Sequence, residues 1–194
     1  MQSKPAYHHG DLPAALVRAA IELLDAEGFD ADLSLRAVAR RAGVSTGAPY
    51  RHFADRSALL AAVAAVGYRQ LTEALRVAES GPDPSLADVA VAYVRFAIER
   101  PGLFRVMFAE GCCQSDNADL VAAVADINAY LLDVVTRSVA ADSPEVAAVG
   151  AWALVHGLAF LYLDGKLDSS SPDAVAETVR SVARTTLGLS ASRS

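Results

Sequence analysis

Apolar side chains recur every three or four residues along most of this chain, which is the spacing of helices that bury one face. The first such run predicts a helix that begins at the capping residue Asp11, carries Pro13 in its first turn and ends at Gly28. We expect Phe29 to pack into the core just after this helix ends. The alternation typical of a β-strand does not stand out in any segment.

The next segment combines helix caps with helix breakers. Ser34 is expected to cap a second helix that ends at Gly43, and Ser45 is expected to cap a third, very short one. Asp55 then caps a long fourth helix that runs to about Ser80, where the sequence SGPDPS breaks the pattern.

The rest of the sequence predicts five more helices, so the expected fold is all-α with about nine helices. The long fourth helix is expected to join a small N-terminal unit, residues 1–57, to a larger C-terminal unit, residues 58–194. The five later helices are expected over SLADVAVAYVRFAIER up to Pro101-Gly102, over LFRVMFAEG, over residues 116–140, from Pro144 to about Asp164, and from Pro172 onward.

Composition indicates a globular protein. Hydrophobic residues make up 53% and charged residues 21% of the 194 residues, which is enough to bury a substantial core. No apolar run approaches the roughly 18 residues of a membrane span, and the start MQSKPAYHHGDL lacks the apolar core of a signal peptide. We therefore expect a soluble, cytoplasmic protein without a membrane partner.

Charge is distributed unevenly along the chain. The net charge is −6, but residues 1–57 are neutral overall and the acidic excess falls in the remainder. Between Arg36 and Arg56 five arginines stand against a single acid, Asp55. A short basic stretch on an acidic protein is typical of a surface that binds the phosphate backbone of a nucleic acid.

This basic stretch contains AGVSTGAPYRHF, residues 42–53. A helix, a turn at Gly43 and a short second helix form a helix-turn-helix, whose second helix enters the DNA major groove. Gly47 lacks a side chain and so lets the backbone approach DNA. We expect Pro49 to lie within the first turn of the short helix, where a missing N–H does least harm. The pattern favours DNA binding over a plain surface loop.

The segment SLRAVARRAGVSTGAPYRHFADRSALL carries a dozen or so informative positions at fixed spacing: Ser34, Val38, Ala39, Ala42, Gly43, Val44, Ser45, Gly47, Tyr50, His52, Phe53, Arg56 and Leu59. With these residues it resembles the DNA-binding segment of TetR-type transcriptional regulators. Two departures are mild, since Ser34 and Arg56 stand where threonine and lysine are commoner. YHHGDL near the start and WALVHG, with Trp152, His156 and Gly157, resemble a TetR subgroup marked by a Trp…His-Gly C-terminal domain.

The resemblance implies an all-helical homodimer that is usually a repressor and not an enzyme. It implies that the N-terminal helices bind one half of a near-palindromic operator in double-stranded DNA. The C-terminal helices are then expected to form the dimer interface and a pocket for a small apolar or amphipathic effector. Effector binding is expected to move the fourth helix, change the spacing of the two reading heads and release the DNA. No cofactor and no catalytic residue is expected.

The resemblance assigns Tyr50 to a phosphate contact, whereas Phe53 is expected in the core. Arg40 and Arg41 stay open between DNA contact and ordinary solvated charge. Thr46 is the one side chain among the first three of the reading helix that can hydrogen-bond, so base readout is expected to rely partly on apolar contacts with thymine methyl groups. The predicted DNA-binding residues are Ser34, Arg36, Ser45, Thr46, Gly47, Ala48, Tyr50, Arg51, His52 and Arg56.

The large apolar residues of the C-terminal unit are either core or the lining of an effector pocket, since ligand sites are concave and mostly apolar. The predicted lining residues are Tyr93, Phe96, Phe104, Met107, Phe108, Tyr130, Trp152 and Phe160, with LFRVMFAEG as one wall. Polar candidates are Arg95, Arg105, Asn128 and His156, of which His156 is expected to be structural. Small residues in the last two helices favour a four-helix dimer interface with Gly157, Phe160, Val179 and Ala183.

Neither a metal site nor a redox site is expected. His8 and His9 are adjacent in the N-terminal arm but lack a second cluster of ligands. Cys112 and Cys113 are neighbours and make a poor disulfide, and Glu110 opposes thiolate formation. Two alternatives to a ligand-responsive regulator stay open, namely a DNA-binding regulator without an effector and a small helical metal- or redox-binding protein.

Overall fold

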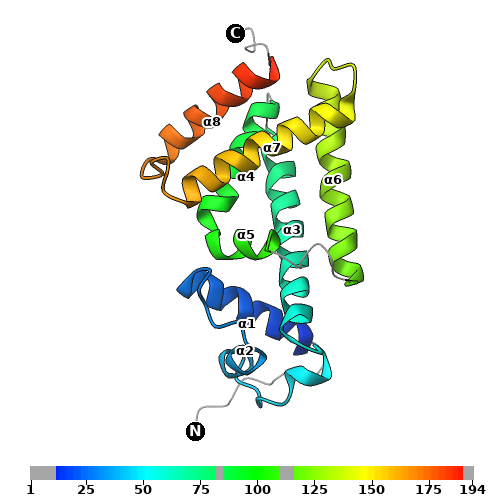
Figure 1. The fold of residues 1–194 in the computed structure, drawn as a ribbon, viewed down its shortest axis with the longest axis vertical. Coiled ribbons are helices and arrows are strands. Elements are labelled where there is room, and N and C mark those ends of the chain that lie inside the picture. The colour runs from blue at the N-terminus through cyan, green and yellow to red at the C-terminus, as the bar shows by residue number, and fades with distance from the viewer. Residues whose placement is uncertain (1–11, 82–84, 110–115, 190–194) are drawn as a thin grey trace.

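The computed structural model describes residues 12–81, 85–109 and 116–189, and in these ranges it contains α-helices and one 3-10 helix but no strand (Figure 1). The all-α prediction is therefore confirmed. Asp11, His8, His9, Glu110, Cys112 and Cys113 lie outside the described ranges. The elements are α1 (Leu12–Glu27), α2 (Leu35–Arg41), the 3-10 helix η1 (Pro49–Arg51), α3 (Arg56–Glu79), α4 (Leu86–Glu99), α5 (Pro101–Met107), α6 (Ala118–Ser138), α7 (Pro144–Leu163) and α8 (Pro172–Leu187).

The N-terminal part of the chain consists of α1, α2 and η1, and α1 packs this part against α3 and α5. Helix α1 contacts α2, α3 and α5, and its inward residues Leu16, Ala20 and Leu24 are almost completely buried. Val38 of α2 and Phe53, which follows η1, complete this part of the core. The core position predicted for Phe53 is thus confirmed. In Figure 1 these elements gather at one end of the molecule, around the lower end of α3.

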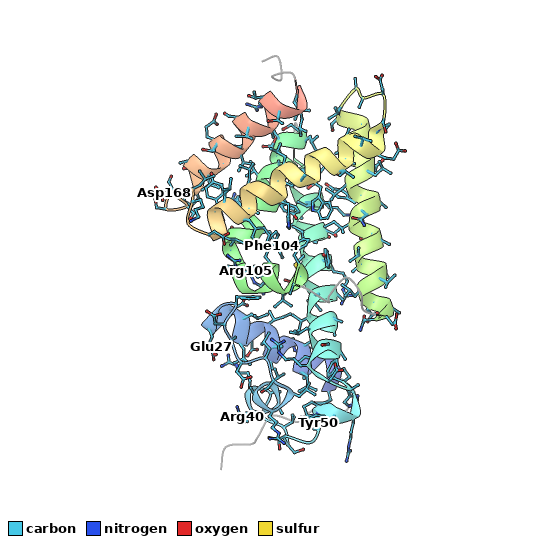
Figure 2. All side chains as sticks on the ribbon, viewed as in Figure 1. Glu27, Arg40, Tyr50, Phe104, Arg105 and Asp168 are labelled. Carbon is cyan, nitrogen blue, oxygen red and sulfur yellow. The ribbon has the colours of Figure 1, made fainter. Side chains whose placement is uncertain are left out.

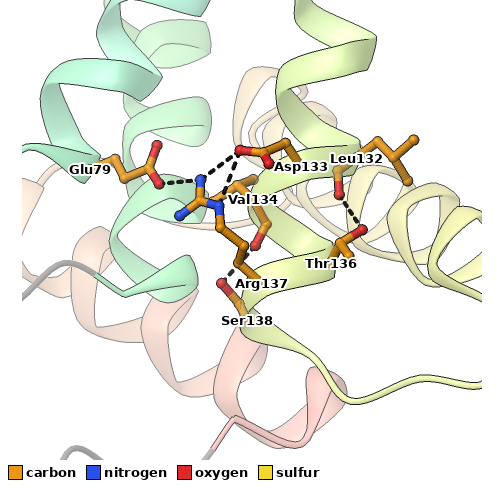
Figure 3. A network of polar contacts seen from close by, with 7 residues as sticks. All are labelled: Glu79, Leu132, Asp133, Val134, Thr136, Arg137 and Ser138. Carbon is orange, nitrogen blue, oxygen red and sulfur yellow. Dashed lines mark hydrogen bonds and ion pairs between the residues drawn. The ribbon is translucent and has the colours of Figure 1, made fainter.

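Helix α3 runs from this end into the body of the molecule, where it contacts α4, α5 and α6 (Figure 1). It crosses α5 closely at Gly67, where an added Cβ atom would lie 2.6 Å from Sδ of Met107. Further along, Arg137 of α6 donates to Oδ2 of Asp133 at 2.8 Å and to Oε1 of Glu79 at 2.6 Å (Figure 3). These bonds raise the pKa of the Arg137 guanidinium and tie the far end of α3 to α6.

The C-terminal helices assemble around α4, which contacts α3, α5, α7 and α8. Arg180 of α8 donates to Oδ1 of Asp88 on α4 at 2.9 Å. An ion pair between Arg105 and Asp164 joins α5 to the end of α7. In Figure 1 α7 crosses in front of α4, and α6 lies beside α3.

Helix α7 departs from the expectation that no apolar run approaches the length of a membrane span. By length and composition alone, its 20 residues are long and apolar enough to cross a membrane, and the mean hydropathy over the most apolar window is 1.9. Only 28% of that window is buried within the protomer. A single helix of this kind is weak evidence for a membrane, and an exposed apolar face fits a protein–protein interface equally well.

Two local expectations are corrected. Phe29 is 51% exposed instead of packed in the core, because the chain turns at Gly28 (φ +77°) and brings Ala31 and Leu33 inward in its place. Helix α5 begins at Pro101 and not after Gly102, since the fixed φ of proline suits the first position of a helix.

Candidate nucleic-acid interface and ligand cavity

Gly43 forms the turn that follows α2. Its φ of +70° is left-handed, a conformation that glycine adopts without steric cost. The amide of Gly43 donates to the Arg40 carbonyl at 3.2 Å, and the amide of Val44 donates to the Ala39 carbonyl at 3.0 Å. These two bonds form a Schellman motif, which closes α2 and redirects the chain. The turn predicted at Gly43 is confirmed.

The element after the turn differs from the predicted helix capped by Ser45. The Ser45 carbonyl accepts from the Ala48 amide at 3.0 Å, and the 3-10 helix η1 begins only at Pro49, without a side-chain cap. An α-helix capped at Ser45 would need the amide of residue 49 to bond that carbonyl, and proline has no N–H. Pro49 therefore tightens the segment into a turn followed by a 3-10 helix, which confines the reading element to a few residues.

Tyr50 and Phe53 lie on opposite sides of this element. The Tyr50 side chain is 53% exposed, whereas Phe53 is 7% exposed and packs in the core. Pro49 is also buried and anchors η1. Tyr50 is thus not a core aromatic, and it lies at the end of the molecule opposite α8 (Figure 2).

Gly47 lies on the exposed turn between the two helical elements. An added Cβ atom would meet nothing within 4 Å among the described residues, and the backbone of Gly47 is not left-handed. The internal packing of this part of the chain therefore does not require a glycine at this position. A requirement for glycine here has to come from something outside the protomer.

The cations near the turn fall into two groups. Arg41 donates from Nε to Oε2 of Glu22 at 2.9 Å, so its charge is paired within the protomer. Arg36, Arg40, Arg51 and Arg56 are exposed and form no ion pair with any residue that the structure describes. Figure 2 shows Arg40 at the same end of the molecule as Tyr50. The sequence left Arg40 and Arg41 equivalent, and the structure separates them.

The N-terminus of α2 is organised by Ser34 and Asp32. The half-buried Ser34 accepts from the Ala37 amide with Oγ at 3.2 Å, which confirms the predicted cap. The Ser34 amide donates to Oδ1 of Asp32 at 2.9 Å. This bond, together with the Ser34 side chain and the charges of Arg40 and Arg56, lowers the pKa of Asp32. Among the remaining predicted residues, Ser45, Thr46 and His52 are exposed and Ala48 is partly buried.

A second candidate site lies between the helices of the C-terminal part. A cavity of about 130 Å³ opens there, and it shares the lining residues Asn128, Leu131 and Trp152 with an adjoining outer pocket of about 280 Å³. Trp152 is 41% exposed at this boundary. The described lining of the inner cavity is Tyr68, Tyr93, Phe108, Val124, Ile127, Asn128, Leu131 and Trp152.

A cluster of aromatic rings around His156 supports the wall of this cavity. Oη of Tyr93 accepts from Nε1 of Trp152 at 3.2 Å and lies 3.1 Å from Nδ1 of His156. Burial raises the pKa of Tyr93 and lowers the pKa of His156, which favours a neutral phenol and a neutral imidazole in this hydrogen bond. The His156 ring lies 4.5 Å from the Phe108 ring. The structural role expected for His156 agrees with these contacts.

The predicted pocket residues divide into three groups. Tyr93, Phe108 and Trp152 line the inner cavity, whereas Phe104 and Phe160 pack against His156 behind it. Phe96, Met107 and Tyr130 line neither the inner cavity nor the outer pocket. Met107 is fully buried against Gly67, and Tyr130 lies under Arg76. Sequence reasoning missed Tyr68, although its place on the apolar face of α3 was a usable signal.

Of the residues predicted at a dimer interface, some are buried within the chain and one is exposed. Val179 and Ala183 are fully buried within the protomer, where α8 packs on α4, so they offer no surface to a partner. Phe160 packs inward against His156 and Phe104. Gly157 is exposed. It shares one face of α7 with other exposed apolar residues, namely Val146, Val149, Gly150, Ala153 and Leu161.

Comparison with known proteins gives matches for both parts of the chain. Residues 16–63 match a family model described as bacterial regulatory proteins, tetR family. Residues 86–186 match a model described as tetracyclin repressor-like, C-terminal domain. A search of curated proteins found no match. The Trp…His-Gly subgroup expected for residues 152–157 stays a prediction.

Solved structures share the fold over nearly the whole chain. A protein with unknown function from Rhodococcus sp. RHA1 is 33% identical over 95% of this chain and 99% of its own, with a TM-score of 0.76. A tetR-family bacterial regulatory protein from Rhodococcus RHA1 is 24% identical over 92% and 98%, with a TM-score of 0.66. The TetR family transcriptional regulator PfmR from Thermus thermophilus is 18% identical over 92% and 96%, with a TM-score of 0.63. The last two likenesses concern the fold alone.

Proposed function

We propose that this chain, which belongs to the TetR family of DNA-binding transcriptional regulators, is a cytoplasmic homodimeric repressor released by a small effector. The family consists of regulators and not of enzymes. In this proposal residues 1–57 bind one half of a near-palindromic operator, and residues 58–194 bind the effector and the second protomer. The observation that carries the proposal is the exposed, cation-rich surface around the Gly43 turn.

The DNA contacts are assigned to the residues predicted from the sequence, with Arg40 added because its charge is unpaired among the described residues. Arg36, Arg51 and Arg56 offer three further cations for phosphates, and phosphate contacts fix the register of a protein on DNA. Tyr50 offers an exposed hydroxyl. Gly47 lets the backbone approach the groove. Thr46, on the exposed turn, is the first candidate for a base contact.

The effector is assigned to the cavity lined by Tyr93, Phe108 and Trp152. Its walls come from α3, α4, α6, α7 and the end of α5, so a ligand there contacts elements that also contact the N-terminal part. Arg100, between α4 and α5, donates to both carboxylate oxygens of Asp25 on α1, at 2.9 and 3.0 Å. It also donates to Oε1 of Gln70 on α3 at 3.3 Å. This bridge supports coupling between the cavity and α1.

The dimer is assigned to the exposed apolar face of α7. Contiguous apolar patches on a soluble protein usually mark an interaction site, and this face presents small residues that permit close packing of two helices. Val146 is 71% exposed and Val149 is 62% exposed. Gly157 keeps the interface role predicted for it, and Ala153 joins it at the centre of the face.

A mobility-shift assay with DNA from upstream of the protein's own gene tests the proposal. We expect a complex that is weakened by salt, because phosphate contacts release counterions. Addition of a cavity ligand is expected to lower the affinity. An intact dimer that gives no shift at low salt contradicts DNA binding by this surface. A shift that no ligand of the cavity alters favours a regulator without an effector.

A further inference from the structure

We infer that the cavity selects a small lipophilic cation, with an apolar or aromatic body in the inner cavity and an ammonium-type head in the outer pocket. The inference rests on the proposed effector site and specifies its ligand chemistry. It follows from which polar groups line the two spaces, which of them are already hydrogen-bonded, and where the charged group lies.

Aromatic side chains line much of the inner cavity, and most polar groups in its described lining are already hydrogen-bonded. Oη of Tyr68 donates to the Met107 carbonyl at 3.2 Å, and the Tyr93 hydroxyl is bonded to both Trp152 and His156. The exposed amide of Asn128 is the remaining polar side chain in the described lining. A ligand part that enters here must therefore be apolar, because buried polar groups without partners are costly.

Neither space offers a cation to an acidic ligand. The described linings of the inner cavity and the outer pocket contain no lysine, arginine or histidine. The nearby cation Arg105 is paired with Asp164, and Arg76 is paired with Asp126. A carboxylate head group would lose water without gaining a charged partner, so acids are disfavoured.

The charged group of the outer pocket is Glu145, in the first turn of α7. It stands seven residues before Trp152, so the two side chains lie on the same face of α7 and line the same pocket. Glu145 makes only a long contact with Ser143, at 3.4 Å, and no ion pair within the described ranges. A cationic head between Glu145 and the Trp152 ring gains a counter-charge and a cation–π contact.

Trp152 is the single tryptophan of the chain, so its fluorescence reports ligand binding at this boundary. We would titrate the DNA-free full-length protein at neutral pH with 4-phenylbutylamine, 4-phenylbutanol and 4-phenylbutyrate, which share one body and differ in the head group. The amine is expected to bind about tenfold more tightly than the alcohol. The carboxylate is expected to bind more weakly than the alcohol.

Glu145→Gln tests the origin of that preference. It is expected to weaken binding of the amine about fourfold and to leave the alcohol unchanged. Glu177→Gln, an exposed acid on α8, is the matched control and leaves all three affinities unchanged. Calorimetric titration of each variant repeats the measurement without relying on fluorescence.

Equal affinities for the three compounds, or tightest binding of the carboxylate, overturn the inference. So does a preference for the amine that is undiminished in Glu145→Gln. If none of the compounds binds, the cation inference is also overturned, whereas DNA binding in the mobility-shift assay is judged separately. A failure of the ligand inference is thereby distinguished from a failure of the proposed repressor function.

Discussion

A substitution at Gly47 is expected to affect DNA binding without destabilising the fold. Because no described atom crowds its missing Cβ, Gly47→Ala is expected to keep or raise the free energy of unfolding, by up to about 1 kcal/mol. The added methyl group stands where the proposal brings the backbone close to DNA, so operator affinity is expected to fall. Urea unfolding and mobility shift measure the two effects on one preparation.

Gly43→Ala is the control for this prediction. At a φ of +70° an alanine is strained, so this variant is expected to lose stability by about 1 kcal/mol. If Gly47→Ala bound the operator as well as the unchanged protein, the proposed close approach at Gly47 would be wrong.

Tyr50 provides a test that leaves the core untouched. Tyr50→Phe removes only a hydroxyl from a side chain that is 53% exposed, so stability should not change. Loss of a phosphate contact is expected to weaken binding to all DNA sequences by a similar factor, which competition assays with specific and random DNA measure. A changed base preference at equal affinity would contradict the role assigned to Tyr50.

His156 gives the protein a predictable dependence on pH. Burial lowers its pKa below the ordinary value of 6.5, so the folded state stays neutral where the unfolded chain already binds a proton. The free energy of unfolding is therefore unaffected by His156 above about pH 6.5, and it falls as the pH drops below that value because the unfolded chain gains a proton that the folded protein does not. Unfolding midpoints measured from about pH 7.5 to about pH 5.5 are expected to decline.

The decline at low pH is expected to weaken in His156→Gln, which removes the titrating group. It should persist in His52→Gln, where an exposed imidazole is removed instead. An equal decline in all three proteins would show that other groups dominate this pH range.

Among the elements, α5 and α1 make a close contact in which the neighbouring atom belongs to the backbone. A Cβ atom on Gly102 would lie 2.9 Å from the Leu24 carbonyl oxygen, which belongs to the backbone of α1. Gly102→Ala must push the two helices apart and is expected to lower the free energy of unfolding by about 1–3 kcal/mol. Gly67→Ala meets the flexible side chain of Met107 and is expected to cost less. Chemical unfolding of both variants checks this order.

The sequence predicted most helix boundaries because they depend on local chemistry. Ser34 and Asp55 cap their helices as expected, and Gly43 ends α2, since a side-chain acceptor or a left-handed glycine acts within a few residues. The helix expected after Ser45 failed for an equally local reason, because Pro49 cannot donate the bond that its first turn requires. That reason was readable from the sequence.

The ligand cavity was harder to predict because it depends on which helices meet. Tyr93, Met107 and Tyr130 all lie at helical spacing on apolar faces, and only the packing decides that Tyr93 borders a cavity. Ala183 was placed at an interface for its small size, yet the same property suits the close packing of α8 on α4. A pattern of small or apolar residues identifies a buried face without identifying its neighbour.

At the scale of the whole molecule, the apolar face of α7 predicts the assembly state. Ala153→Glu places a charge at the centre of this face and is expected to dissociate the proposed dimer, because a buried unpaired charge is costly. Sedimentation velocity measures the change from dimer to monomer, and operator binding should weaken with it. Ala122→Glu on the exposed side of α6 is the matched control and should remain dimeric.

A dimer that survives Ala153→Glu would show that the interface lies elsewhere. An unchanged protein that is monomeric in solution at micromolar concentration would also contradict the assembly proposed here. Binding of the unchanged protein to lipid vesicles would instead assign the apolar face of α7 to a membrane surface.

The crossing of α3 and α5 at Gly67 has a mechanical consequence. Gly67 lies near the middle of α3, about 17 Å from the end that adjoins η1, at 1.5 Å per residue. With the crossing as a fulcrum, a tilt of about 10° displaces that end by about 3 Å, which exceeds the tolerance of a hydrogen bond. Because Gly67 lies near the middle of α3, the opposite end of the helix would move by a similar distance. In the proposed repressor, a tilt of this size is large enough to take Tyr50, which precedes α3, out of reach of a phosphate.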